Sequence, residues 1–244
     1  MTLVNSRQSC QLLPVFQGGA LQNSVGQIMT TSIERPLRLL CLHGYRQTGS
    51  SFREKTGALR KQLKKHAEFV FITSPVSVPP VDDGQDKDGG CGWWFSRPDD
   101  FFKAQDETNC AKGFEVIESC FKDSGPFDGI LGFSQGAAML GLLCGLQQQG
   151  KLPFSFKFAI FASAFRSGSS PHQHLYSKKI TLPSLHIFGE TDQVIEKAMS
   201  EDFLQLFDEP YTLVHPGGHF IPATAAQKTT YVQFLENMKQ LCDV

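Results

Sequence analysis

The sequence predicts an α/β fold in which a mostly parallel central sheet of about six or more strands is covered by helices on both faces. Three observations lead to this prediction. Short apolar runs, typical of buried strands, alternate six times with helix-like segments after residue 33, mostly through short connections. The chain has 244 residues, which is enough for one full hydrophobic core. No internal repeat or linker divides residues 34–244, so we expect a single domain there.

The expected strands are short and mainly apolar, as strands buried on both faces usually are. They are residues 37–42, 69–72, 128–133, 158–162, 184–188 and 211–214. Helices are expected at residues 51–65, 107–122, from Ser134 to Gly150, at 196–207, and in a last segment near the C-terminus. In the last of these, apolar residues share one helical face: Phe234, Leu235, Met238 and Leu241.

Two segments lack this alternation of strands and helices. Residues 1–33 are rich in Ser, Gln and Gly, and Arg7 is their only charged residue, so we expect a flexible N-terminal extension. Residues 75–100 form a long irregular stretch that contains both tryptophans of the protein. Within it we expect residues 81–90 to be mobile and residues 92–96 to pack near the functional site.

Composition and charge exclude several classes of function. The formal net charge of −1 provides no basic surface for nucleic acid or an anionic membrane. Seven cysteines without any C-x-x-C pair predict free thiols in a reducing compartment, with no zinc site and no disulfide scaffold. No metal or cofactor is expected, and no apolar run approaches the ~18 residues of a transmembrane helix. We expect a soluble, cytoplasmic protein, with mitochondrial targeting by residues 1–33 as the open alternative and the oligomeric state undetermined.

The pentapeptide from Gly132 to Gly136 carries the strongest chemical signal. Its sequence, Gly-Phe-Ser-Gln-Gly, follows an apolar strand and precedes a run of small helix-forming residues. A G-x-S-x-G motif in this context is typical of a nucleophile elbow, where a sharp strand-to-helix turn exposes the serine hydroxyl. Glycines two residues on either side avoid clashes at such a turn. We therefore predict that Ser134 is a nucleophile, and a chance match in a Gly-rich chain is the less favoured alternative.

A serine nucleophile needs a base and an acid, and these are expected beyond the carboxyl ends of other strands. Asp192 follows strand 184–188, and we favour it as the acid over Glu190, which lies nearer the strand. His219 follows strand 211–214, and we favour it as the base over His215, because Gly217 and Gly218 give its loop freedom to turn back over the sheet. The chain order Ser, Asp, His is the order used by α/β-hydrolases.

The loops around this predicted triad supply further candidates. The backbone N–H groups of Tyr45 and Gln135 are the expected oxyanion hole, while His43 is expected to shape the loop after the first strand. We expect His186 to be a hydrogen-bonded core residue, and His172 and His174 to be solvated in a Ser-rich loop. The candidates for the substrate pocket are aromatic: Trp93, Trp94, Phe165 and Phe220. For the two tryptophans, a plain packing role remains an equal alternative.

Five stretches of the chain together resemble the FSH family of serine hydrolases. They are LCLHGYRQTGSSF, GWWFS, FDGILGFSQGAAM, LPSLHIFGETDQVI and HPGGHFIP, and the resemblance covers about residues 35–242. It implies an α/β-hydrolase fold, hydrolysis of carboxylic esters, a leaning to longer acyl chains, and a triad at Ser134, Asp192 and His219. Two features depart from the family pattern: Ser163-Ala164-Phe165 stands where Ser-Gly-Phe is expected, and the N-terminal extension has no counterpart.

The sequence therefore predicts a metal-free serine hydrolase that cleaves carboxylic esters with medium- to long-chain acyl groups through an acyl-enzyme. Its partner would be a small-molecule acyl ester. The main alternative is a thioesterase or lysophospholipase acting on acylated proteins or lipids, since the same triad serves both. A non-catalytic binding protein on the same fold is a third reading, against which the intact Ser, Asp and His argue.

Overall fold

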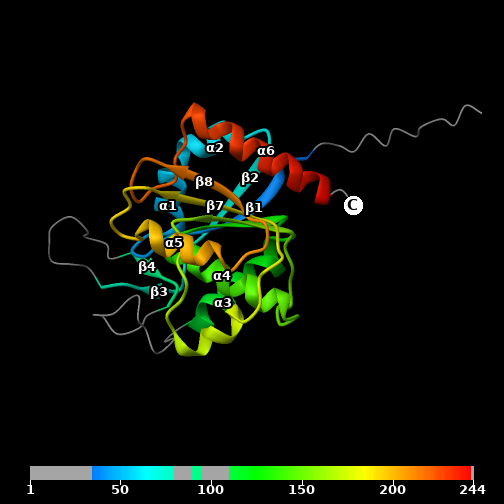
Figure 1. Cartoon of the computed structure of the whole chain (residues 1–244). Helices are drawn as coiled ribbons and strands as arrows, with labels where there is room; N and C mark the ends of the chain where they lie inside the picture. Colours follow the sequence, from blue (N-terminus) through cyan, green and yellow to red (C-terminus); the bar gives the residue numbers. More distant parts are fainter. Residues whose placement is uncertain (1–34, 80–89, 95–109, 243–244) are drawn as a thin grey trace, which may run out of the picture. The chain divides into compact units, whose positions relative to one another are not determined.

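A computed structural model describes residues 35–79, 90–94 and 110–242 (Figure 1). Its central feature is a six-stranded sheet in the order β2-β1-β5-β6-β7-β8, and every neighbouring pair in it is parallel. The strands are β1 (Leu37–Leu42), β2 (Ala67–Ile72), β5 (Gly129–Phe133), β6 (Phe158–Ala162), β7 (Ser184–Gly189) and β8 (Tyr211–His215). The predicted parallel α/β architecture is confirmed.

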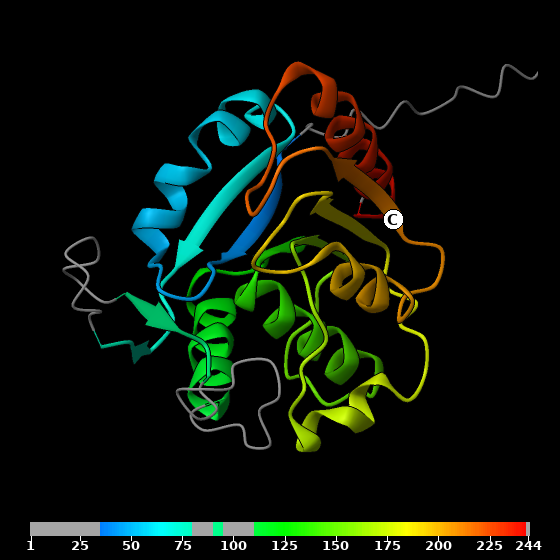
Figure 2. The same ribbon diagram turned by 60° about the vertical axis from the view of Figure 1, so that its left-hand side comes forward.

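Helices cover both faces of this sheet (Figures 1 and 2). On one face, α1 (Gly49–Lys55), α2 (Gly57–Leu63) and α6 (Ala225–Cys242) pack over a core that includes Phe52, Leu59 and Phe234. The other face is covered by α3 (Cys110–Ser124), α4 (Gln135–Gln148), α5 (Lys197–Leu204) and the short 3₁₀-helix η1 (Ser170–Tyr176). Among these, α4 is buried along residues 135–145, because the sheet and η1 enclose it.

The register of the sheet aligns the carboxyl ends of its strands. Phe133 at the end of β5 pairs with Ala162 at the end of β6, and Ala162 pairs with Ile187 of β7. Gly189 in turn pairs with His215. The residues that follow these strand ends therefore emerge at one edge of the sheet, which we call the carboxyl edge.

Two segments differ in detail from what the sequence predicts. The predicted helix 51–65 is two helices that meet at Thr56, because the Thr56 hydroxyl bonds back to the Phe52 carbonyl at 2.8 Å and the next residue is Gly57. The Ser-rich segment near His172, expected to be a solvated loop, contains η1. Gly150 follows the end of α4 with φ of 67°, as its predicted role at the helix end requires.

A second, two-stranded sheet was not predicted. Its antiparallel strands are β3 (Val76–Ser77) and β4 (Cys91–Gly92), and it lies beside the carboxyl ends of β1 and β2 (Figure 2). The Cys91 N–H bonds to the Gln47 carbonyl at 2.9 Å, which ties β4 to the loop after β1. This sheet brings Trp93 and Trp94 into the core, with 0% and 3% of their surfaces exposed. Packing of residues 92–94 agrees with the expectation for residues 92–96.

Other expectations fall outside the described residues. These are the flexible extension at residues 1–33 and, except for Gly90, the mobile segment 81–90. The chain divides into two units, residues 1–33 and 34–244, and the sheet and its helices belong to the second. Over the described ranges, no helix has both the length and the apolar character that crossing a membrane would require.

At the opposite, amino edge of the sheet, a buried carboxylate joins the start of β1 to the segment before β5. Asp128, just before β5, accepts two hydrogen bonds of 2.7 Å from the Arg35 guanidinium and one of 2.7 Å from the Arg38 N–H. The Arg38 side chain donates to the carbonyls of Ser124 and Pro126. Burial by itself would raise the pKa of Asp128, but the hydrogen bonds and charges of Arg35 and Arg38 outweigh it and lower the pKa.

Candidate active site

Ser134 occupies the turn between β5 and α4, as the pentapeptide predicts. Its φ of 53° and ψ of −118° are strained for a residue with a side chain. A Cβ on Gly132 would lie 2.6 Å from the Gly136 carbonyl oxygen, and one on Gly136 would lie 2.3 Å from that of Leu42. Both glycines are therefore needed for the close approach of α4 to the sheet. The Ser134 N–H bonds to the Ala162 carbonyl at 2.8 Å, which anchors the turn to β6.

Backbone strain gathers at the carboxyl edge. Within the described ranges, four non-glycine residues have positive φ: Arg46, Ser134, Ser163 and Glu209. Arg46 lies in the loop after β1, while Ser134 and Ser163 directly follow β5 and β6, and their φ values are 59°, 53° and 48°. Such conformations cost on the order of 1–3 kcal/mol each and concentrate at functional sites. This concentration marks the carboxyl edge as the candidate site independently of the sequence motif.

Asp192 and His219 are brought together by the loops after β7 and β8. The His219 Nδ1 lies 2.8 Å from the Asp192 Oδ2, and the side chains are 20% and 0% exposed. The other carboxylate oxygen, Oδ1, accepts the N–H groups of Val194 and Ile195, each at 2.9 Å. Burial alone would raise the pKa of Asp192, but the hydrogen bonds from His219 and these two amides lower it. A carboxylate held in this way stays ionised and fixes the His219 tautomer with its proton on Nδ1.

The ring of His219 also lies beside the serine turn. Its centroid is 4.8 Å from that of Phe133, the residue before Ser134. Nδ1 faces Asp192, so Nε2 is the ring nitrogen that is not engaged by the acid. The three predicted residues thus converge on one edge of the sheet.

The rival acid and base lie in different surroundings. Glu190 is exposed, and its N–H bonds to the His215 carbonyl at 2.8 Å. His215 is buried, its Nδ1 lies 3.3 Å from the Gly217 N–H, and its Nε2 has no hydrogen-bond partner among the described residues. Burial lowers the pKa of His215 despite the nearby charges of Asp192 and Glu190. Neither rival makes the acid–base contact that joins Asp192 to His219.

The residues expected to supply the oxyanion donors lie in the segments that follow β1 and β5. Gln135 is the first residue of α4, where a backbone N–H has no acceptor within the helix. Tyr45 lies in the loop after β1, and the side chain of His43 stabilises this loop. The His43 Nδ1 lies 2.7 Å from the Gly44 carbonyl, and the His43 Nε2 accepts the Ser74 N–H at 3.0 Å. Burial lowers the pKa of His43 to about 4, so this histidine is neutral and its place in the loop is structural.

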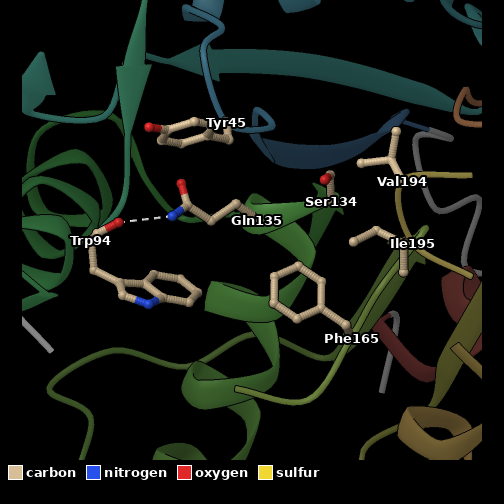
Figure 3. Close-up of a pocket in the computed structure, with 7 residues that line it drawn as sticks. All are labelled: Tyr45, Trp94, Ser134, Gln135, Phe165, Val194 and Ile195. Atoms are coloured by element: carbon tan, nitrogen blue, oxygen red, sulfur yellow. Dashed lines mark hydrogen bonds between the residues drawn. The ribbon is translucent and has the colours of Figure 1, made fainter. Parts of the chain in front are cut away.

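The side chain of Gln135 has a role that the sequence did not suggest. Its Oε1 accepts the Trp93 N–H at 2.9 Å, and its Nε2 donates to the Trp94 carbonyl at 2.8 Å (Figure 3). The Trp93 indole N–H donates to the His43 carbonyl at 2.8 Å. The double tryptophan is therefore attached both to the start of α4 and to the loop after β1.

A cavity of about 190 Å³ opens beside the serine, and we call it the serine cavity. Its wall is mostly apolar, with the Ser134 hydroxyl between the Gln135 and Val194 side chains (Figure 3). The lining residues are Tyr45, Trp94, Ser134, Gln135, Phe165, Val194 and Ile195. Two pocket candidates, Trp94 and Phe165, are among them. Val194 and Ile195, on the loop of Asp192, were missed because their apolar side chains carry no chemical signal in the sequence.

The structure places the other two pocket candidates elsewhere. Trp93 is completely buried and does not line the serine cavity, and its indole N–H is bonded to the His43 carbonyl instead. Phe220 is 50% exposed and packs against His215, with ring centroids 4.9 Å apart. It lines a separate groove of about 380 Å³, the histidine groove, formed by Gln47, Phe52, Lys55, Thr56, Phe133, His219, Phe220 and Ile221.

The remaining histidines follow expectation with one exception. His186 is a core residue, with its Nε2 3.0 Å from the Ser184 hydroxyl, and burial lowers its pKa to about 3. His174 is exposed. The prediction that His172 is solvated is wrong: its Nδ1 lies 2.7 Å from the Ser167 hydroxyl, and its ring packs edge-on against Trp94. The formation of η1 buries it. Within the described ranges, no three His, Cys, Asp or Glu side chains are grouped so that they could hold a metal ion.

The parallel sheet, the strained serine turn and the acid and histidine on later strand ends define an α/β-hydrolase. Solved structures agree on the fold. The chain is similar to esterase PE8, with a TM-score of 0.58 and 23% identity over 83% of this chain and 92% of that one. It is also similar to acyl-protein thioesterase 2 of Zea mays, with a TM-score of 0.54 and 18% identity over 83% of this chain and 94% of that one.

Sequence comparison narrows the class to a family. Residues 29–231 match the family described as "Serine hydrolase (FSH1)". A relative from Danio rerio, named Esterase OVCA2, is 47% identical over 224 residues, which cover 84% of this chain and 98% of the relative. The chain belongs to the FSH1 serine hydrolase family, and the expected resemblance is confirmed.

Proposed function

We propose that this serine hydrolase is an esterase that cleaves carboxylic esters with medium- to long-chain acyl groups through an acyl-enzyme intermediate. The observation that carries the proposal is the hydrogen-bonded Asp192–His219 pair beside a strained Ser134 that opens into an apolar cavity. Family membership and relatives named as esterases support the same activity.

In the proposed reaction, the Ser134 Oγ attacks the ester carbonyl while the His219 Nε2 accepts the hydroxyl proton. Negative charge develops on the carbonyl oxygen, and the N–H groups of Gln135 and Tyr45 stabilise it. His219 then gives the proton to the leaving alcohol as the tetrahedral intermediate collapses to the acyl-enzyme. A water molecule, activated by the same histidine, releases the carboxylic acid and restores the serine.

The two hollows suggest how the substrate is oriented. The serine cavity is lined by Trp94, Phe165 and Ile195, so it suits an acyl chain, and each buried CH₂ group contributes about 0.8 kcal/mol. His219 must reach the leaving oxygen, and together with Phe133 it lines the histidine groove. We therefore assign the acyl chain to the serine cavity and the leaving group to the histidine groove.

The test is the turnover of p-nitrophenyl esters of graded chain length by the wild type and by Ser134→Ala. The expected result is a loss of several orders of magnitude in kcat for Ser134→Ala on every ester. Ser177→Ala is the control, because this exposed serine bonds only to a nearby carbonyl in η1 and its loss leaves the site intact. Equal turnover by wild type and Ser134→Ala would refute the proposal.

The alternative leaving group is a thiol, as in a thioesterase, or a lysophospholipid alcohol. The proposed machinery treats these carbonyls alike, so matched oxygen esters, thioesters and lysophospholipids with one acyl chain must be compared by kcat/KM. A fluorophosphonate probe addresses the non-catalytic reading, because it labels only an activated serine. Labelling that disappears in Ser134→Ala is expected, and an unlabelled folded wild type would favour a binding protein.

A further inference from the structure

Ser163 directly follows β6 and is buried, with 1% of its surface exposed. Its φ of 48° lies in the left-handed region that glycine adopts without strain. A serine kept in this conformation is held there by its surroundings, and such strain points to a function for the side chain. Nothing in the reaction proposed above uses this hydroxyl.

The hydroxyl of Ser163 meets the same carboxylate oxygen as the candidate base. Its Oγ donates to the Asp192 Oδ2 at 2.9 Å, while the His219 Nδ1 donates to this oxygen at 2.8 Å. An ionised carboxylate only accepts hydrogen bonds, so the Ser163 proton must point at Asp192. Together with the Val194 and Ile195 amides on Oδ1, the carboxylate has two donors on each oxygen.

The backbone on either side of Ser163 is tied to the rest of the site. The Ser163 N–H bonds to the Ile187 carbonyl of β7 at 2.8 Å. The preceding carbonyl, of Ala162, accepts the Ser134 N–H at 2.8 Å, and the following one, of Ala164, accepts the Ser200 hydroxyl at 2.9 Å. Residues 162–164 thus hold the serine turn with their backbone and the acid with a side chain.

We propose that Ser163 is a positioning residue: its hydroxyl locks the Asp192 carboxylate so that His219 presents Nε2 to Ser134. This inference rests on the proposed function, since it assigns Asp192 and His219 to the reaction. With Ser163 in place, a rotation of the carboxylate breaks its bonds to Ser163, to His219 and to two amides at once. The O–H dipole also offsets part of the negative charge that faces the imidazolium formed during the reaction.

Two substitutions separate positioning from a purely structural role. Ser163→Ala removes the hydroxyl and keeps the backbone strain, whereas Ser163→Gly removes the hydroxyl and relieves the strain. Ser184→Ala is the matched control, because Ser184 is equally buried and its hydroxyl contacts His186 at the amino end of β7. Each variant is measured for Tm, for kcat and KM on a p-nitrophenyl ester, and for the pH dependence of kcat/KM.

We expect Ser163→Ala and Ser163→Gly to lower kcat by a similar factor, roughly 10- to 100-fold, with little change in KM, because the serine cavity is untouched. The acid limb of the pH profile should move to higher pH in both, since Asp192 then favours the protonated base more strongly. The other ionisable groups nearby are unchanged in these variants: His215 and Glu190 on the two loops, and Lys55 at the histidine groove. Ser184→Ala should lower Tm and leave the pH profile in place.

The inference is overturned if Ser163→Gly keeps the kcat and the acid limb of the wild type, or if activity follows Tm so that Gly restores what Ala loses. A second readout needs no turnover: the low-field proton NMR signal of the His219 Nδ1–H should weaken or exchange faster in Ser163→Gly. An unchanged signal would also contradict the inference. Failure of the proposed function looks different, because Ser134→Ala would then retain full activity whatever Ser163 does.

Discussion

Two buried carboxylates lie at opposite edges of the same sheet and have opposite kinds of partner. Asp128 at the amino edge is bound by the Arg35 guanidinium and the Arg38 N–H. Asp192 at the carboxyl edge is bound by a histidine, a serine hydroxyl and two amides. Hydrogen bonding outweighs burial in both, and the pKa of each carboxyl group is lowered.

The partners decide what each carboxylate does. Arginine stays charged at every pH that a protein experiences, so the Asp128 cluster is a permanent tie between the start of β1 and the segment before β5. A histidine can take up and release a proton, so in the proposed reaction the charge of the Asp192–His219 pair can change. A lowered carboxyl pKa therefore does not by itself mark a catalytic site, and the identity of the partner is the informative feature.

The largest expected effect comes from Asp192→Asn. The asparagine amide would place an N–H₂ group opposite His219 and favour the tautomer with its proton on Nε2, which cannot accept the serine proton. We expect kcat to fall on the order of 10⁴-fold. The measurement is ester turnover together with circular dichroism. If Asp192→Asn kept the kcat of the wild type, Asp192 would not be the acid of the proposed reaction, and its contrast with Asp128 would fail.

The matching change at the amino edge, Asp128→Asn, should affect stability and not rate. Losing the charge leaves a buried site with weaker bonds to Arg35 and costs about 1–3 kcal/mol. For a domain of this size, each kcal/mol lowers Tm by about 2–4 °C. Thermal unfolding and ester turnover are measured on the same sample, and kcat should stay within about two-fold.

Glu68→Gln serves as the control for Asp128→Asn. Glu68 pairs with Arg38 at 3.7 Å, but its side chain is 56% exposed, so the pair contributes less than about 1 kcal/mol. If Glu68→Gln lowered Tm as much as Asp128→Asn does, the buried Asp128 cluster would stabilise the fold no more than an exposed ion pair.

A smaller effect is expected from the wall of the serine cavity. Phe165→Leu shortens a side chain that lines this cavity and should favour longer acyl chains. The ratio of kcat/KM between a long and a short ester should rise roughly 3- to 10-fold. This rise corresponds to the free energy of burying about one to two additional CH₂ groups of the acyl chain. Asp128→Asn should leave this ratio unchanged. A ratio unaffected by Phe165→Leu would place the acyl chain elsewhere.

The smallest effect concerns the pH dependence of stability. A carboxyl group whose pKa is lower in the folded state than in the unfolded state stabilises the fold above its unfolded pKa, and this contribution disappears as the pH falls through the folded value. Stability should therefore drop below about pH 4. Asp128→Asn should be less stable than wild type at pH 7 and approach it at low pH. Urea unfolding at a series of pH values measures this, and parallel curves would contradict it.

The prediction of the fold succeeded where a local pattern is strong. The run Leu37–Leu42 is β1 in full, and the apolar face of the last helix is buried in α6 except for Leu241, which is 49% exposed. It was less accurate where a single side chain redirects the backbone, as Thr56 does between α1 and α2. The pairing of β3 with β4 joins residues on either side of a long segment, and no local sequence pattern predicts it.

For the candidate site, the sequence by itself selected Ser134, Asp192 and His219, because each residue follows an apolar strand and has a chemical type suited to acyl transfer. Their convergence follows from the parallel sheet, whose strand ends meet at one edge. The backbone strain at Ser134 could also be predicted, because glycines two residues on either side of a serine are typical of a sharp strand-to-helix turn.

Only the tertiary structure decided which neighbours support these residues. It buries Trp93 and turns Trp94 into the serine cavity, puts Phe220 in the histidine groove, buries the side chain of His172 within η1, and aims Ser163 at Asp192. The physical reason is that each of these roles depends on a direction in space set by contacts between distant segments. The identity of a residue determines its chemistry, whereas the packing around it decides the direction in which its side chain points.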